Sequence, residues 1–319
     1  MTTAQKVIKY CAIAFAVFLI VSIIGGIIGA VSSFSFIFNA KDAVGEMQTY
    51  AVTDAVENLE IDLSGAQLEV KTDDNFSVKS NHKYLKLENT DGSLLIKEDH
   101  PVFGFHSEGA LVILTVPEDF AFNKVTISAG AGEVKADTLL SEKLSLNLGA
   151  GEVHIDKLVA TTRATINSGA GELNIGGGEL ADLDFDMGVG EANLQSRLTG
   201  DCDIDYGVGE LNLTLIGTAD DYRISLDKGA GKATLDGVKM SDDVVYGDGE
   251  NSIEIDGGVD DMKIEFSDCD FIGARSGFAH DVPQTDRHEH CILYAALNVE
   301  MSKKHEGWPA PNRFFGFRA

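Results

Sequence analysis

The chain has 319 residues, and 51 acidic against 25 basic side chains give it a formal charge of −26 at pH 7. Such a charge repels nucleic acid and acidic lipid, so it argues against a nucleic-acid partner and favours cations or basic proteins. Hydrophobic residues make up 44% of the chain, which is enough for a packed core. The four cysteines form no C-x-x-C pair, so no zinc or redox motif is indicated.

The first element in chain order is an apolar segment, with no charged residue between positions 10 and 40. As a helix, residues 10–31 would extend about 33 Å, enough to cross a hydrocarbon core of about 30 Å. Lys6 and Lys9 precede the segment and no comparable positive bias follows it, so the positive-inside rule predicts a cytoplasmic N-terminus. We expect residues 1–40 to be this N-terminus and a single-pass plasma-membrane anchor, and residues 41–56 to be a linker to an extracytoplasmic region.

Two features of the apolar segment leave alternatives open. A cleaved signal peptide is an alternative to the anchor, although the apolar region of a signal peptide is normally shorter, about 7–15 residues. Gly25 and Gly29 form a G-x-x-x-G step, which allows two membrane helices to approach closely and to self-associate. Small residues are also common in membrane helices that do not dimerise, so the step alone does not establish a dimer.

The middle of the chain repeats a G-x-G motif roughly every 19–20 residues. Apolar and polar residues alternate on both sides of each motif, which is typical of a strand with one buried face. Each repeat predicts a strand, a sharp bend, a second strand and a polar return such as residues 137–143. The expected bends are Gly130, Gly132, Gly149, Gly151, Gly169, Gly171, Gly188, Gly190, Gly207, Gly209, Gly229, Gly231, Gly247 and Gly249.

A repeat of this length is the signature of a solenoid. It is too short for a unit of one helix and two strands, and it suits one rung of a β-solenoid with rungs about 4.8 Å apart. We predict an all-β, single-stranded parallel β-solenoid with rungs of about 19–20 residues over residues 57–274. Residues 59–70 form an imperfect first rung. The glycines permit bending and close backbone approach, and no nucleotide-binding loop is indicated because the G-K-[ST] context is missing.

Three features together resemble a known group of proteins. They are the N-terminal anchor, a strand that ends in LTVPEDF, and the segment KVTISAGAGEVKAD with its further G-x-G-E rungs. Over about residues 55–270 they resemble the bacterial "putative adhesin" family of uncharacterised membrane-anchored β-solenoid domains. The resemblance implies export and a solenoid fold, and it carries over no catalytic residue. Some members of the family sit in cell-envelope-stress operons of Gram-positive bacteria, so an accessory role in such a response is an alternative function.

Outward-facing carboxylates are the candidate functional groups. Charges stacked about 5 Å apart repel each other, so they need solvent screening, proton sharing or cations, and calcium takes six to eight oxygen ligands. A solvated surface without a ligand is the alternative interpretation, and no cofactor beyond weakly bound calcium is expected. The candidate weak cation sites are Glu133, Glu152, Glu172, Glu191 and Glu210 in one column, which Lys232 interrupts before Glu250, and Asp184, Asp186, Asp203 and Asp205 in a second grid.

We expect no enzymatic activity, because no nucleophile–base arrangement is legible and the repeats contain few aromatic or arginine residues to hold a sugar. A glycan-processing β-helix enzyme is therefore only a third option. Residues 275–319 change abruptly in composition and are expected to be a divergent tail or cap. The sequence predicts a membrane-tethered, extracytoplasmic module with a structural or adhesin-like role at the bacterial envelope, and an envelope protein or cell-wall component as its partner.

Overall fold

The computed structural model describes residues 43–52, 55–99, 109–242 and 244–267. The expected anchor at residues 10–31, the Gly25–Gly29 step and the tail at residues 275–319 lie outside the described residues. Within the described residues, no helix has the length and apolar character needed to cross a membrane.

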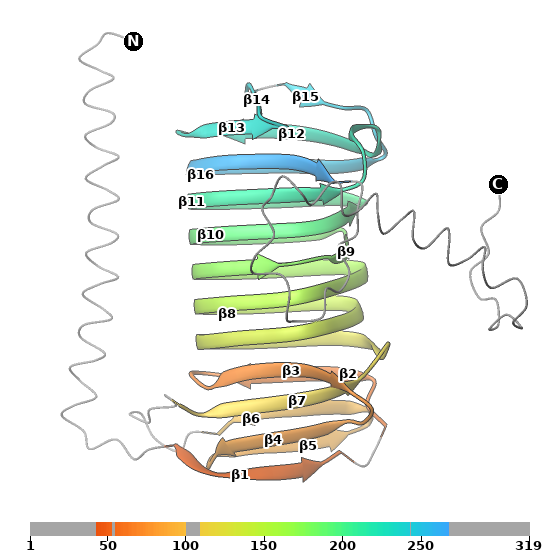
Figure 1. The fold of residues 1–319 in the computed structure, drawn as a ribbon, viewed down its shortest axis with the longest axis vertical. Helices are drawn as coiled ribbons and strands as arrows, with labels where there is room; N and C mark the ends of the chain where they lie inside the picture. The colour runs from red at the N-terminus through yellow and green to blue at the C-terminus, as the bar shows by residue number, and fades with distance from the viewer. Residues whose placement is uncertain (1–42, 53–54, 100–108, 243, 268–319) are drawn as a thin grey trace, which may run out of the picture.

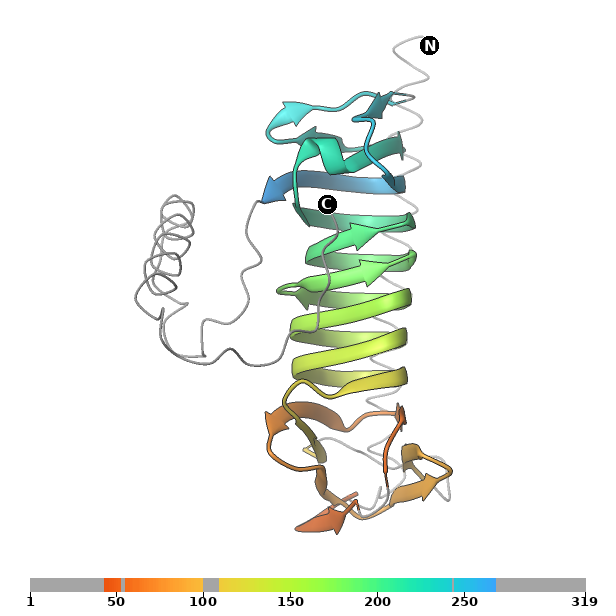
Figure 2. The same ribbon diagram turned by 90° about the vertical axis from the view of Figure 1, so that its right-hand side faces the viewer.

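The described chain is all-β and forms one long sheet that winds into a stack (Figures 1 and 2). We use "rung" for one turn of the chain in this stack. Its strands are β1 (Val44–Ala51), β2 (Asn58–Leu63), β3 (Gln67–Asp73), β4 (Ser77–His82), β5 (Leu85–Thr90), β6 (Ser93–Glu98), β7 (Leu111–Pro117), β8 (Ala121–Ile175), β9 (Gly178–Ala181), β10 (Leu183–Thr199), β11 (Asp201–Ile216), β12 (Tyr222–Lys228), β13 (Lys232–Leu235), β14 (Val238–Lys239), β15 (Val245–Tyr246) and β16 (Asn251–Ser267), and η1 (Ala219–Asp221) is a short 3-10 helix.

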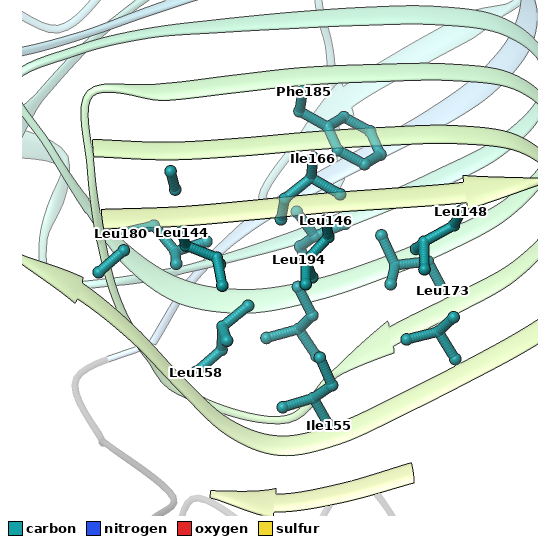
Figure 3. Packing of buried hydrophobic residues seen from close by; sticks show 14 of the residues in the cluster. Leu144, Leu146, Leu148, Ile155, Leu158, Ile166, Leu173, Leu180, Phe185 and Leu194 are labelled. Atoms are coloured by element: carbon teal, nitrogen blue, oxygen red, sulfur yellow. The ribbon is translucent and has the colours of Figure 1, made fainter. Parts of the chain in front are cut away.

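The middle rungs follow chain order with parallel register, as the sequence period predicts. β10 pairs with the end of β8 so that Phe185 lies beside Ile166, and it pairs with β11 so that Phe185 also lies beside Ile204. All three side chains are buried. In Figure 3, Ile166 and Phe185 project into the interior together with other apolar side chains of neighbouring rungs. The predicted strand register is therefore confirmed here.

The repeated glycines allow successive rungs to approach closely at the bends. Gly151 has a φ of 152°, in the region that favours glycine, and a Cβ atom on it would collide with the carbonyl oxygen of Gly132. Gly190 repeats this arrangement against the carbonyl oxygen of Gly171. A side chain at either of these two glycines would therefore collide with the neighbouring rung.

The segments between rungs are less polar than the sequence pattern predicts. Leu139, Leu158, Leu180, Leu198 and Leu215 are all buried. The short strand β9 pairs with both β8 and β10 and places Leu180 between Ala160 and Leu198. Each return therefore supplies inward apolar side chains to the core, because a closed turn of chain must bury its interior on every side.

At the N-terminal end of the stack, the rungs depart from chain order. The rung formed by β2 and β3 lies between β8 on one side and the rung of β6 and β7 on the other. Antiparallel strands cover the outer rung, since β5 pairs with β6, β4 pairs with β7, and β1 pairs with β4. Residues 44–51, which were expected in the linker, are thus the edge strand β1. Residues 59–70 form a rung, as predicted.

At the C-terminal end, β16 lies between β11 and β12, although it follows both in the chain. The bend of this rung is Gly257–Gly258, and Gly258 lies against Gly207 on one side and Gly229 on the other. The prediction that Gly247 and Gly249 form a bend of the stack is wrong. Both glycines instead approach the backbone near Tyr222, because residues 236–250 lead the chain back to its inserted last rung.

Candidate functional surface

The predicted glutamate column exists in the middle of the stack. Glu191 is in register with Glu172 on one side and with Glu210 on the other. These three exposed carboxylates, together with Glu152, line an open groove along the bend glycines. Beyond Glu210 the column departs from the prediction. Because β16 is inserted between β11 and β13, the next residues in register are Asp261 and then Lys232. Glu250 precedes β16 and is not part of the column.

A ladder of asparagine side chains runs beside the glutamates. The Asn193 amide donates to the Asn174 side-chain oxygen at 2.8 Å, and the Asn212 amide donates to the Asn193 oxygen at 2.9 Å. Each amide also donates to the glutamate of its own rung. These bonds join Asn174 to Glu172 at 2.7 Å, Asn193 to Glu191 at 2.9 Å and Asn212 to Glu210 at 3.2 Å. The ladder holds the carboxylates in one orientation and offsets part of their repulsion.

Sequence reasoning missed the asparagine ladder, although its signal was legible. The motif G-x-G-E is followed two residues later by asparagine in three consecutive rungs. Positions two apart on a strand face the same side, so the Glu and the Asn of one rung had to be neighbours. At the start of the column, Glu133 differs, because it forms an ion pair with Lys135.

The aspartate grid also exists, and it is larger than predicted. Asp184 is in register with Asp203, and Asp186 is in register with Asp205. The second row continues across the inserted strand to Asp256 and then to Asp227. Asp186, Asp205 and Asp256 border a shallow groove together with Tyr206. Asp256 and Asp227 could not be placed in this row from the sequence, because the order of the last two rungs was unknown.

The environment of the aspartate row favours protonation of two of its members. Partial burial, followed by the charges of Asp205 and Asp184, raises the pKa of Asp186 above its ordinary value. Partial burial, followed by the charges of Asp205, Asp227 and Asp203, likewise raises the pKa of Asp256. Asp186 and Asp256 lie on either side of Asp205. These two carboxyl groups bind protons more readily than isolated aspartates do, and their protonation reduces the repulsion within the row.

The carboxylate surface attracts positive charge without enclosing a site. Arg163 supplies one local cation, at 3.3 Å from Asp184. Among the described residues, no three histidine, cysteine or acidic side chains come close enough together to hold a metal ion. The exposed carboxylates of the described residues therefore form open rows along the rungs.

Comparisons with solved structures give distant similarities. A putative cell adhesion protein from Clostridium sporogenes is 17% identical, with a TM-score of 0.35, and the match covers 70% of this chain and 99% of that protein. A putative adhesin from Bacteroides fragilis is 12% identical, with a TM-score of 0.33, over 70% of this chain and all of that one. A putative lipid binding protein from Parabacteroides distasonis is 14% identical, with a TM-score of 0.25, over 70% and 99%.

No curated protein matches the chain. A family model does match. It covers residues 56–263, which begin just before β2 and end within β16. This range includes the glutamate column, the asparagine ladder and the aspartate grid, so the whole candidate surface lies inside the family domain. The chain belongs to the Toastrack DUF4097 family.

Proposed function

We propose that this protein is a membrane-tethered, extracytoplasmic β-solenoid that serves as a structural or adhesin-like interaction module of the bacterial cell envelope. Membership of the Toastrack family and the in-register parallel rungs support the solenoid part of the proposal. The uncharged segment at residues 10–40 supports the anchor. The module acts by binding and not by catalysis.

The position of β1 supports one orientation of the stack relative to the membrane. β1 begins at Val44, soon after the proposed anchor at residues 10–31, and it is the edge strand at one end of the sheet. The end built from β12, β14 and β15 is then the one farther from the membrane. In this arrangement the two carboxylate surfaces run along the stack away from the membrane. The anchors of two copies associate through close approach at Gly25 and Gly29.

The repetition of the exposed carboxylates is the observation that carries the interaction role. Glu172, Glu191 and Glu210 repeat at the spacing of one rung, and the asparagine ladder fixes their orientation. A periodic row of like groups binds an extended or repetitive partner through many weak contacts, whose combined strength exceeds that of any single contact. A basic envelope protein or a cell-wall component with cationic groups fits such a row, and calcium bound weakly by the carboxylates fits it too.

Co-sedimentation with purified cell-wall material tests the proposal. The full chain in detergent is mixed with cell walls at increasing salt, and the bound fraction is measured for the wild type and for Glu172→Gln with Glu191→Gln. The matched control changes Glu142 and Glu179, which are exposed carboxylates outside the two surfaces, to Gln. We expect binding that salt weakens, that the column variant loses and that the control keeps. Equal binding by both variants would remove the glutamate column from the proposed function.

The same material distinguishes a binding module from a glycan-processing enzyme. Released sugar is measured after prolonged incubation of cell walls with the wild type and with Asp184→Asn and Asp203→Asn. We expect no sugar release by any of the three proteins. Release by the wild type that both variants abolish would replace the proposal with an enzymatic function.

A further inference from the structure

The last rung of the stack is held between two rungs that precede it in the chain. β16 pairs with β11 from Ser252 to Ser267, and on its other side it pairs with β12 and then with β13. From β8 to β11, in contrast, each rung lies on the one before it. β16 thus occupies a slot between two walls, which are β11 on one side and β12 with β13 on the other. Both walls precede β16 in the chain.

The slot holds β16 through both backbone and side chains. Ile255 lies in register with Ile204 on one wall and with Leu226 on the other, and all three are buried. Met262 similarly lies between Leu211 and Ala233. Both edges of β16 therefore form parallel ladders, and neither wall could keep its edge paired if the slot were empty.

A long connection joins β16 to the rest of the stack. The described residues of this connection, 236–242 and 244–250, contain two strands of two residues each, β14 and β15, and Val238, Val244 and Val245 are exposed. Pairing of β14 with β13 and of β15 with β12 and burial of the Met240 side chain hold these residues on their own stack, and the Ser241 N–H donates to the Tyr246 hydroxyl at 2.7 Å. When fully extended, this length of chain spans at most about 50 Å.

We propose that β16 is exchanged between two copies of this protein, so that the β16 of each copy fills the slot of the other. Exchange recreates every ladder and apolar contact of β16, because the slot and the strand are identical in the two copies. Only the contacts of residues 236–250 change. The exchange joins the two stacks through the end that carries β12, β14 and β15. It is independent of the proposed anchor and of the role of the carboxylates.

Cysteine cross-linking between differently tagged copies tests this proposal. Ser225 on β12 and Glu254 on β16 are in register, and neither side chain is buried. Neighbouring strands lie about 4.8 Å apart, within the Cα separation that a disulfide tolerates. One full-length copy carries Ser225→Cys and the other carries Glu254→Cys, and the two are co-expressed and oxidised. Cys11, Cys269 and Cys291 are changed to Ser throughout, and Cys202 is kept because its thiol is buried.

A matched pair measures the background. Asp184→Cys and Asp203→Cys lie in register on β10 and β11, which follow each other directly in the chain, so exchange of β16 does not place them in different copies. We expect the Ser225–Glu254 pair to give several-fold more mixed-tag disulfide dimer than the Asp184–Asp203 pair. Dimerisation through the anchor raises both yields equally and does not produce this difference. Equal yields from the two pairs would overturn the exchange.

A single-chain variant checks the geometry on which the test depends. With Ser225→Cys and Glu254→Cys in one chain, an intramolecular disulfide is expected in copies that keep their own β16. If neither an intramolecular nor a mixed-tag disulfide forms, β16 does not lie beside β12, and the proposal is overturned as well.

Discussion

Lys232 lies in register with Asp261, and its backbone N–H donates to the Asp261 carboxylate at 3.1 Å. In a stack that followed chain order, Lys232 would face Glu210. Because β16 lies between β11 and β13, the basic residue sits one rung farther out and ends the acidic column. The insertion of one strand therefore extends the row of like charges by one carboxylate.

The register of the core predicts opposite effects for two adjacent residues. Phe185 is 1% exposed between Ile166 and Ile204, so Phe185→Asp buries an unpaired charge and should lower the free energy of unfolding by several kcal/mol, about 3–5. Asp184→Ser should change it by less than about 1 kcal/mol, since Asp184 is partly exposed and its ion pair with Arg163 is at the surface. Denaturant unfolding of the full chain measures both. Similar losses for the two variants would contradict the register.

The bend glycines predict a steric effect that depends on position. Gly151→Val places a side chain against the carbonyl oxygen of Gly132 at a φ that valine avoids, and it should destabilise the stack by roughly 1–3 kcal/mol or more. The matched control is Ala150→Val, because Ala150 is exposed at the same bend. Thermal unfolding compares the two variants, and a control that loses as much stability as Gly151→Val would argue against the close approach as the cause.

The aspartate row predicts a specific dependence of stability on pH. A raised pKa of Asp186 and Asp256 means that folding favours their protonated forms, so this contribution is present below the ordinary value of 3.8 and is lost as pH rises through the raised pKa values. Asp186→Asn with Asp256→Asn should therefore raise the melting temperature at pH 7 and change it little near pH 3. Glu142→Gln is the control. A double variant that is less stable than the wild type at pH 7 would contradict the assignment.

The glutamate column predicts a response to calcium. Glu152→Gln with Glu172→Gln relieves repulsion, so this variant should melt at a higher temperature than the wild type in EDTA. Millimolar calcium should then stabilise the wild type more than the variant, because a ligand that binds only the folded state raises stability. Equal melting temperatures of the wild type in EDTA and in calcium would leave the carboxylates as a solvated surface.

The period-two pattern was sufficient to predict the strands, their buried faces and the neighbours of the middle rungs. Ile166, Phe185 and Ile204 illustrate why, since a shift of one residue would have exposed all three. The bend at Gly257–Gly258 was missed because it lacks the G-x-G spacing, whereas Gly247 and Gly249 have that spacing and serve another purpose.

The order of the last two rungs could not be predicted from the apolar pattern. Leu226 and Ile255 have similar size and the same alternation around them, so either could pack on Ile204 with a similar gain from burial. What separates the two orders is the path of residues 236–250, which depends on tertiary contacts such as the N–H of Gly249 donating to the carbonyl of Tyr222 at 3.1 Å. The same limit applies to the candidate surface. Asp256 and Asp261 lie on the inserted strand, and Asp227 joins the row because it is in register with Asp256.

Protease accessibility in oriented membrane vesicles tests most directly the claim that the stack is tethered outside the cytoplasm. Vesicles of both orientations are prepared from cells that produce the full chain, and protease is added with and without detergent. The account predicts that residues 41–319 are digested in right-side-out vesicles and protected in inside-out vesicles until detergent is added. Digestion of the stack in intact inside-out vesicles, or its release from the membrane as a soluble protein, would contradict it.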